Sequence, residues 1–156
     1  MQVFIMRHGA ASLEASSDLA RPLVKYGYNT SMYMASFLKE KSFKIERVLV
    51  SPYLRAQQTL SAVREVLTLS EENIDIIHDL KPYGNVDVIM YFLRKLAKTG
   101  ISSIILISHL PLICYLISEL CPEYNLPVLS TSAITCISCF NNKKNVLEWH
   151  INPIYK

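Results

Sequence analysis

The chain has 156 residues, of which 51% are hydrophobic and 19% charged, so its composition excludes a disordered protein and is typical of one globular domain spanning residues 1–156. Its formal net charge is +3 at pH 7, without a dense run of lysine or arginine. That balance argues against nucleic acid or an anionic membrane as a partner, and any bound anion must meet a few focused cations.

Apolar runs alternate with amphipathic stretches along the chain. The runs are typical of strands buried in a mostly parallel sheet, and the stretches between them of helices that connect one strand to the next. In chain order, we predict a strand at 2–7, a polar loop at 8–20, a helix at 23–40, a strand at 47–50, a helix at 52–67, a strand at 74–77, a helix at 86–98, a strand at 104–107, a helix at 111–120, and strands at 133–140 and 146–150. The pattern indicates an α/β fold with a mostly parallel sheet and a C-terminal antiparallel hairpin.

The stretch 101–121 is apolar enough to resemble a membrane span, with no charged residue before Glu119. His109 and Pro111 lie near its centre, however, so we expect a buried strand, a turn and a helix. No basic segment precedes the first apolar run, and no small-residue cleavage site follows it. The sequence therefore predicts a soluble cytoplasmic protein without membrane contact.

Cys136 and Cys139 form a single CxxC pair. They lie on a predicted strand, where residues three apart point to opposite faces, so chelation or a disulfide between them is awkward. No second CxxC or nearby histidine completes a zinc site. We predict two buried thiols, in the reduced state that the cytoplasm maintains.

Three of the buried strands deliver arginine or histidine to their carboxyl ends. The first strand ends in Arg7 and His8. Arg55 lies on the first turn after the second strand, and His109 follows the strand at 104–107. Ligands of open α/β sheets bind just beyond the carboxyl ends of the strands, so we expect these four side chains to converge at one edge.

A cluster of this kind is suited to an anion, because its cationic members repel one another when nothing neutralises them. Guanidinium groups match phosphate oxygens in a bidentate way. One neutral ring nitrogen of a histidine can attack phosphorus while the other donates to a backbone carbonyl. No Asp or Glu accompanies the strand-end histidines, so the pattern indicates a phosphate site without a metal or another cofactor.

Three motifs at these strand ends resemble the histidine phosphatase superfamily, whose members share the phosphoglycerate mutase fold. They are R-H-G at 7–9, S-P-x-x-R-A-x-Q-T at 51–59 and the strand-end His109. Within the superfamily, the small size and further segments resemble the SixA-type phosphohistidine phosphatases. Those segments are A-R-P-L at 20–23, S-H-L-P at 108–111 and T-S-A-I at 131–134. The resemblance spans essentially the whole chain.

The resemblance implies a three-layer α/β/α fold and a role for each motif residue. His8 would be the nucleophile that becomes phosphorylated, and Arg7 and Arg55 would clamp the phosphoryl oxygens. His109 would donate to the phosphoryl group and stabilise charge in the transition state. Arg21, on the loop before the first helix, is a further candidate for a phosphate contact, with a surface ion pair as the alternative.

The sequence offers no clear acid to protonate a leaving group. Relatives that act on phosphate esters use a carboxylic acid, in many of them directly after R-H-G, where this chain has Ala10. Asp79 is the next candidate, with loop capping as the alternative. An alcohol needs a proton as it leaves, whereas imidazole, with a pKa of ~6.5, takes up its proton easily. We therefore predict a phosphohistidine substrate and poor activity on ordinary esters.

By resemblance, the partner would be a histidine-containing phosphotransfer domain of a two-component phosphorelay or a phosphocarrier of a phosphotransferase system. Aromatic side chains such as Tyr53 and Tyr83 are candidates for the contact surface. Ser51 and Thr59 are expected to be structural. No apolar stripe is left over to demand a dimer, so we expect a monomer.

Two other functions stay open. One is a broad small-molecule phosphomonoesterase of the same superfamily, which a clear acid near the pocket and a lid insertion would favour. The other is a non-catalytic phosphohistidine-binding adaptor. The intact His8 argues against an adaptor, because a pure binder would need only the cations.

Overall fold

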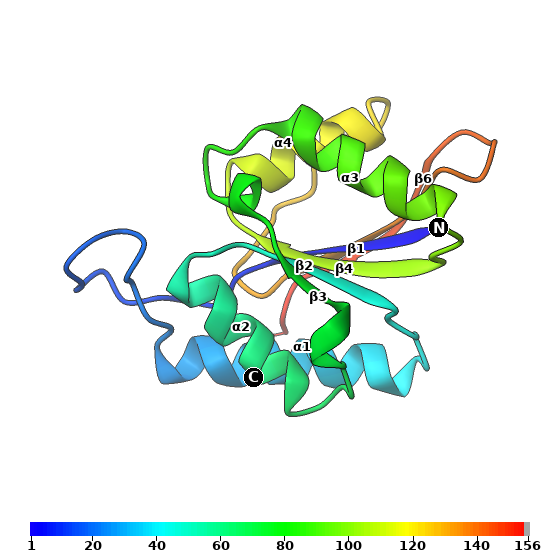
Figure 1. Ribbon diagram of the computed structural model, residues 1–156. Coiled ribbons are helices and arrows are strands. Elements are labelled where there is room, and N and C mark those ends of the chain that lie inside the picture. Colours follow the sequence, from blue (N-terminus) through cyan, green and yellow to red (C-terminus); the bar gives the residue numbers. More distant parts are fainter. Residues whose placement is uncertain (155–156) are drawn as a thin grey trace.

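The computed structural model describes residues 1–154. Its six strands form one sheet in the order β3-β2-β4-β1-β5-β6, with α3 and α4 on one face and α1 and α2 on the other (Figure 1). The strands are β1 (Gln2–Arg7), β2 (Arg47–Val50), β3 (Ile74–Ile76), β4 (Ser103–Ser108), β5 (Ile134–Ser138) and β6 (Val146–Ile151). The helices are α1 (Lys25–Glu40), α2 (Leu54–Arg64), α3 (Val86–Lys98) and α4 (Leu112–Leu120), with short 3-10 turns η1 (Glu71–Asn73) and η2 (His78–Leu80). The predicted three-layer α/β/α fold is confirmed.

The parallel core of the sheet brings the carboxyl ends of three strands to one edge. β4 pairs in parallel with β1 on one side and with β2 on the other, and Arg7 is in register with Ser108. β5 runs antiparallel to β1, and β6 to β5, which confirms the predicted C-terminal hairpin. The edge at which His8 follows β1 is therefore the edge at which His109 follows β4.

Both faces of the central strands are buried, as their continuous apolar sequences predict. Val3 and Ile5 of β1 pack in the cluster that includes α3 and α4, whereas Phe4 and Met6 pack in the cluster that includes α1 and α2. None of these four side chains is more than 1% exposed. Burial of each large apolar side chain is worth about 1.5–3 kcal/mol, so both layers hold the strand that delivers His8.

Cys136 and Cys139 pack on opposite sides of the sheet, as the alternation of the strand predicts. Cys136 belongs to the apolar cluster under α1 and α2, and Cys139 to the cluster under α3 and α4. Both are free thiols. Burial raises the pKa of each to about 12, so they act as unreactive packing residues.

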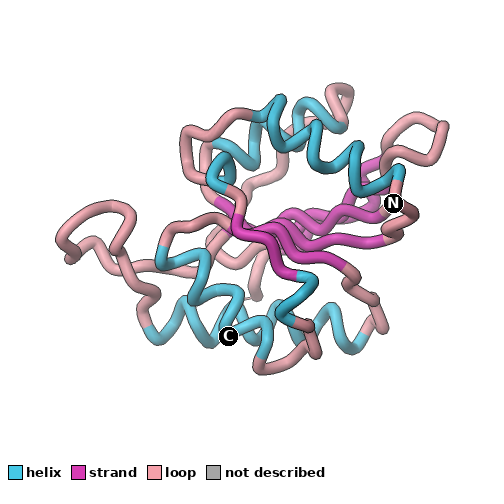
Figure 2. The backbone as a smooth tube through the Cα atoms, viewed as in Figure 1, coloured by secondary structure: helices cyan, strands magenta, loops and turns pink. Residues whose placement is uncertain are grey.

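Three helices are shorter than the sequence predicts, and α4 differs least, because it begins one residue late. α1 starts two residues late because Leu23 is held in an isolated antiparallel bridge with Ala11. α2 starts after Tyr53, whose backbone is still extended. The loop at 8–24 is consequently longer than predicted, and it projects beyond the edge of the sheet (Figure 2).

The apolar segment 101–121 folds as predicted into a strand, a turn and a helix. It forms β4 and α4, with His109 and Pro111 in the turn between them. Within residues 1–154, no helix is long and apolar enough to cross a membrane.

The start of α1 lies directly against the segment that follows His8. A Cβ atom on Gly9 would lie 2.4 Å from the carbonyl oxygen of Gly27, and a Cβ atom on Gly27 would lie 2.1 Å from that of Ala10. Both distances are far inside van der Waals contact, and the opposing atoms belong to the backbone. The two glycines therefore allow the close approach that packs α1 behind the strand end.

Gly27→Ala should destabilise the protein by about 1–3 kcal/mol, because the added methyl group must push the segment after His8 away from α1. The midpoint of urea unfolding measures this loss. Asn29→Ala, at an exposed position of the same helix, is the matched control and should change stability by less than about 0.5 kcal/mol. Equal midpoints for the two variants would contradict the proposed close packing.

Candidate active site

Backbone contacts hold His8 at the end of β1. Its N–H donates to the carbonyl of Ser108 at 3.0 Å, and its own carbonyl accepts from the N–H of Ser132 at 3.1 Å. The N–H of Gly9 donates to Thr59 Oγ1 at 2.9 Å. Thr59 therefore has the structural role that the sequence predicts, and His8 is fixed from β4, from the T-S-A-I segment and from α2.

Two hydrogen bonds determine which ring nitrogen of His8 carries the proton. Nδ1 lies 2.7 Å from the carbonyl oxygen of Gly9, which can only accept, so Nδ1 carries the hydrogen. Nε2 lies 3.2 Å from Nε of Arg55, which can only donate. The lone pair of Nε2 is thus directed into the site, and Nε2 is the nitrogen that can act as a nucleophile.

His109 lies beside His8, with 4.9 Å between the ring centroids. Its Nε2 is 2.6 Å from Ser51 Oγ. Its Nδ1 is buried and has no hydrogen-bond partner within the described part of the chain. Ser51 Oγ also accepts from the N–H of Tyr53 at 3.3 Å, and it keeps a hydroxyl hydrogen that it can donate to Nε2. In that arrangement Nδ1 of His109 carries a proton that it can donate to an oxyanion.

Ser51 is therefore a site residue that sequence reasoning missed. The sequence predicts only a structural role for it at the end of β2, but its hydroxyl is the hydrogen-bond partner of His109 Nε2. The available signal was its position, because Ser51 and His109 both directly follow neighbouring parallel strands.

Arg55 and Arg7 both lie close to the two histidines. Arg55 is 4% exposed, and its guanidinium carbon lies 4.9 Å from the ring centroid of Tyr53. Nη1 of Arg7 donates to the carbonyl of Leu129 at 2.7 Å. Arg7 and Arg55 are close enough to both histidines to influence their pKa values.

Both site histidines are held in the neutral form. Burial and the positive charges of Arg55, Arg7 and Arg21 together lower the pKa of His8 from 6.5 to about 4, against the opposing effect of the hydrogen bond to the Gly9 carbonyl. Burial also lowers the pKa of His109 to about 2, with additional contributions from His8 and Arg55. A neutral His8 retains the Nε2 lone pair that nucleophilic attack requires.

Arg21 lies at the rim of this cluster and contacts another loop residue. Its Nη1 is 3.1 Å from Oδ1 of Asp18, and its Nε donates to the carbonyl of Ser12 at 2.7 Å. Oδ2 of Asp18 lies 3.2 Å from Nη2 of Arg55. Sequence reasoning did not single out Asp18; the spacing of Asp18 and Arg21 is visible in the chain, but nothing local links either of them to Arg55.

The comparisons with known proteins agree with this geometry. No protein-family model matches the sequence. Phosphohistidine phosphatase SixA of Escherichia coli (strain K12) is 44% identical over 153 residues, which are 98% of this chain and 94% of that protein. The SixA homolog of Haemophilus influenzae is 33% identical over 160 residues, covering 99% and 98%. The chain belongs to the SixA family of phosphohistidine phosphatases.

A solved structure agrees with this assignment. The protein histidine phosphatase SixA complexed with tungstate superimposes with a TM-score of 0.93 at 44% identity, over 98% of this chain and 97% of that one. The predicted resemblance to the histidine phosphatase superfamily and to the SixA group is thereby confirmed, and with it the assignment of the chain to a family of hydrolases.

This member of the SixA family has no acid directly after R-H-G, and Asp79 lies in a turn. Oδ1 of Asp79 accepts from the N–H of Asn85, at the start of α3, at 3.2 Å. The same turn is tied to β4 because the hydroxyl of Ser108 donates to the carbonyl of Leu80 at 2.6 Å. Loop capping, the alternative that the sequence left open, describes these contacts, and an acid role for Asp79 stays a prediction.

Among the described residues, no group of three or more His, Cys, Asp or Glu is arranged to hold a metal ion.

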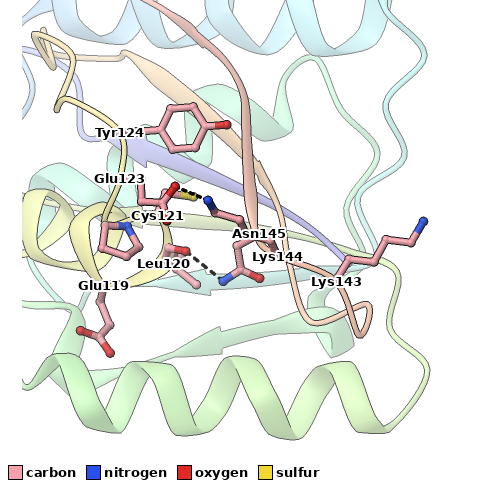
Figure 3. Close-up of a pocket in the computed structure, with 9 residues that line it drawn as sticks. Glu119, Leu120, Cys121, Glu123, Tyr124, Lys143, Lys144 and Asn145 are labelled. Atoms are coloured by element: carbon pink, nitrogen blue, oxygen red, sulfur yellow. Dashed lines mark hydrogen bonds and ion pairs between the residues drawn. The ribbon is translucent and has the colours of Figure 1, made fainter.

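A cleft of about 360 Å³ lies between the end of α4 and the loop of the β5–β6 hairpin (Figure 3). Side chains of both charges line it, including Glu123 and Lys144, which pair across it. Ser138, at the start of this hairpin loop, is in register with Gln2, so the cleft lies at the opposite edge of the sheet from His8.

Ser51→Ala should lower the turnover of phosphohistidine about tenfold, because His109 then loses the partner that keeps its proton on Nδ1. Long-range ¹⁵N–¹H NMR of the wild type should show His109 protonated at Nδ1, and the variant should show a mixture of tautomers. Ser61→Ala removes an exposed hydroxyl from α2 and should change neither observation. A wild-type His109 protonated at Nε2 would refute the assignment.

Stability should fall as the pH is lowered below 6.5. Both histidines have pKa values of 6.5 in the unfolded chain and far lower values in the folded one, so acid protonates the unfolded state first. Between pH 6 and its folded pKa, each histidine should lower the free energy of unfolding by about 1.4 kcal/mol per pH unit. Above pH 7 neither histidine should change it.

Urea unfolding of the wild type and of His109→Asn at pH 7, 6 and 5 measures this effect. The difference between the two proteins isolates one histidine from the carboxylates that also titrate in acid. Equal pH dependence in the two proteins would show that His109 is not buried in the neutral form.

Proposed function

We propose that the protein is a phosphohistidine phosphatase that removes the phosphoryl group from a histidine-containing phosphotransfer domain or a phosphocarrier protein. The observation that carries the proposal is the state of His8. Its Nδ1 is committed to the Gly9 carbonyl, and its unprotonated Nε2 faces the guanidinium group of Arg55. A phosphoryl group bound at Nε2 would meet that guanidinium group directly.

The first step transfers the phosphoryl group to His8. Nε2 attacks phosphorus, the bond between phosphorus and the substrate imidazole breaks, and the leaving nitrogen keeps the bonding electrons and takes up a proton from solvent water. Arg55 and Arg7 offset the charge on the phosphoryl oxygens, and Nδ1–H of His109 donates to one of them as the charge redistributes. The Gly9 carbonyl stabilises the positive charge that develops on the His8 ring.

The second step regenerates the enzyme. A water molecule attacks the phosphorus of phospho-His8, the bond between phosphorus and Nε2 breaks, and inorganic phosphate forms. One proton of that water passes to solvent or to the phosphate, and Nε2 regains its lone pair.

The acids around the site support phosphohistidine over phosphate esters. Ala10 cannot donate a proton, and the carboxylate of Asp79 is bonded to the backbone of a turn. Partial burial would raise the pKa of Asp18, but hydrogen bonds from Arg21 and Arg55 outweigh it and lower that pKa, so Asp18 is ionised. An imidazole can leave without a proton donor in the site, whereas an alcohol needs one.

We further propose that the protein acts as a monomer in the cytoplasm, on a two-component phosphorelay or a phosphotransferase system. All four cysteines are free thiols, which suits a reducing compartment. The predicted contact residues differ in exposure. Tyr83 is 85% exposed and available to a folded partner, whereas Tyr53 is partly buried against His109 and Arg55.

The decisive experiment mixes the protein with a histidine phosphotransfer domain that carries radiolabelled phosphate, and follows label on the partner, on the enzyme and as free phosphate. The wild type should release phosphate and carry label transiently on His8. His8→Ala should release at least about a thousandfold less, because the nucleophile is gone.

Two outcomes would replace the proposal. Faster hydrolysis of small phosphate esters than of the labelled domain would identify a phosphomonoesterase and make Asp79 the acid to test. Tight binding of the labelled domain without turnover would identify a phosphohistidine-binding adaptor. His78→Ala, at an exposed position beside Asp79, is the control for loss of a histidine and should turn over like the wild type.

A further inference from the structure

In the projecting loop that follows His8, Asp18 is hydrogen-bonded to the buried Arg55. Nη1 of Arg55 donates to the backbone carbonyl of Asp18 at 2.6 Å, and Nη2 lies 3.2 Å from Oδ2 of the same residue. The next residue, Leu19, accepts at its carbonyl from the N–H of Leu54 at 3.0 Å, which fixes this part of the loop on the start of α2. Asp18 thus accepts hydrogen bonds from Arg55 with both its backbone carbonyl and its carboxylate.

The contacts of Arg55 divide its guanidinium group into two edges. Asp18 occupies the outer edge, formed by Nη1 and one hydrogen of Nη2. The other edge, formed by Nε and the second hydrogen of Nη2, contains the donor that points at Nε2 of His8. Two parallel N–H groups on that edge match two oxygens of a phosphoryl group attached to His8. Asp18 therefore contacts Arg55 without covering the edge that faces the phosphoryl group.

Arg21 reaches this arrangement through the same carboxylate. Oδ1 of Asp18 contacts Arg21 and Oδ2 contacts Arg55, so each arginine binds a different oxygen. The Asp18 side chain is 55% exposed, and such a carboxylate is free to change rotamer unless something restrains it. Arg21, itself anchored on the Ser12 carbonyl, supplies that restraint.

The charges of the three arginines near His8 also favour the contacts from Arg21 through Asp18 to Arg55. The guanidinium groups of Arg7, Arg21 and Arg55 all lie close enough to His8 to lower its pKa, so they also repel one another. Asp18 sets a negative charge between two of them, and its carboxylate is near enough to act on the pKa of His109 in the raising direction. The pocket can therefore hold Arg55 in place before any phosphoryl group arrives.

We propose that Asp18 is a positioning residue for Arg55, and that Arg21 acts through Asp18 and not by touching the phosphoryl group. The inference rests on the proposed function, because it concerns the clamp on a phosphoryl group bound at His8. Arg21 thus forms an ion pair, which was the alternative to a phosphate contact. That ion pair keeps the edge of Arg55 that contains Nε directed at His8.

A double-mutant cycle tests the proposal. The proteins are the wild type, Arg21→Met, Asp18→Ala and the double variant, and the substrate is the radiolabelled phosphotransfer domain. Asp18→Ala should lower kcat/KM about tenfold and Arg21→Met about threefold. The double variant should be no worse than Asp18→Ala, because Arg21 has nothing left to hold. If the two losses of kcat/KM instead multiply, the double variant should lose about thirtyfold. That result would show that Arg21 acts directly on the phosphoryl group and would overturn the proposal.

Inhibition by tungstate, a tetrahedral oxyanion, separates positioning from a merely structural role. Asp18→Ala should raise the inhibition constant about tenfold at a temperature where the variant is fully folded by circular dichroism. Asp18→Asn keeps an acceptor oxygen for Arg55 and should recover part of that loss. Unchanged tungstate inhibition in Asp18→Ala would overturn the proposal.

Asp75→Ala is the matched control, because it breaks the ion pair of Asp75 with Arg47, an arginine that is 25% exposed like Arg21. It should leave kcat/KM and tungstate inhibition unchanged. The wild type in the same assay distinguishes the two hypotheses. A wild type that releases no phosphate contradicts the proposed function, whereas an active wild type with multiplying effects contradicts only the role of Asp18.

Discussion

The hydrogen bond between Nδ1 of His8 and the carbonyl of the next residue, Gly9, is the contact on which the chemistry of the site depends. The segment that carries this carbonyl is held by Thr59, which accepts from the N–H of Gly9, and by the close approach of α1 at Gly27. A side chain at either glycine would move the carbonyl. The chemistry of one ring nitrogen is thus tied to the packing of a helix behind the sheet.

The electrostatics of the site follow from burying two imidazoles among arginines. A charged histidine in such surroundings would suffer both desolvation and repulsion, so His8 and His109 stay neutral and their pKa values fall far below 6.5. Neutrality provides a nucleophile at His8 and a single directed N–H at His109. The positive charge that an anionic substrate needs comes from guanidinium groups, which remain protonated in any pocket.

The acids near the site are each committed elsewhere or absent. Ala10 has no proton to give, Asp79 caps the turn before α3, and Asp18 is bonded to two arginines. A site with strong phosphate binding and no free acid is selective by its chemistry, since it favours leaving groups that are easily protonated. This lack of a free acid is the basis on which we propose phosphohistidine, and not phosphate esters, as the substrate.

Much of the fold and most of the site follow from local sequence patterns. Continuous apolar runs identify β1, β2 and β4, because a strand buried on both faces has no polar side to alternate with. The placement of Arg7, His8, Arg55 and His109 then follows from one rule, that parallel strands end at a common edge. The helix boundaries were less predictable, since the bridge between Ala11 and Leu23 is a tertiary contact that delays α1.

The sequence by itself determined which residue types stand at the strand ends, and so the phosphate chemistry. Only the tertiary structure decided their contacts: the Gly9 carbonyl and Arg55 fix the tautomer of His8, Ser51 bonds to His109, and Asp18 bonds to Arg55. The partners of Arg55 and His109 are separated from them by 37 to 58 positions in the chain. No local pattern encodes such contacts, because they exist only once two layers of helices have closed over the sheet.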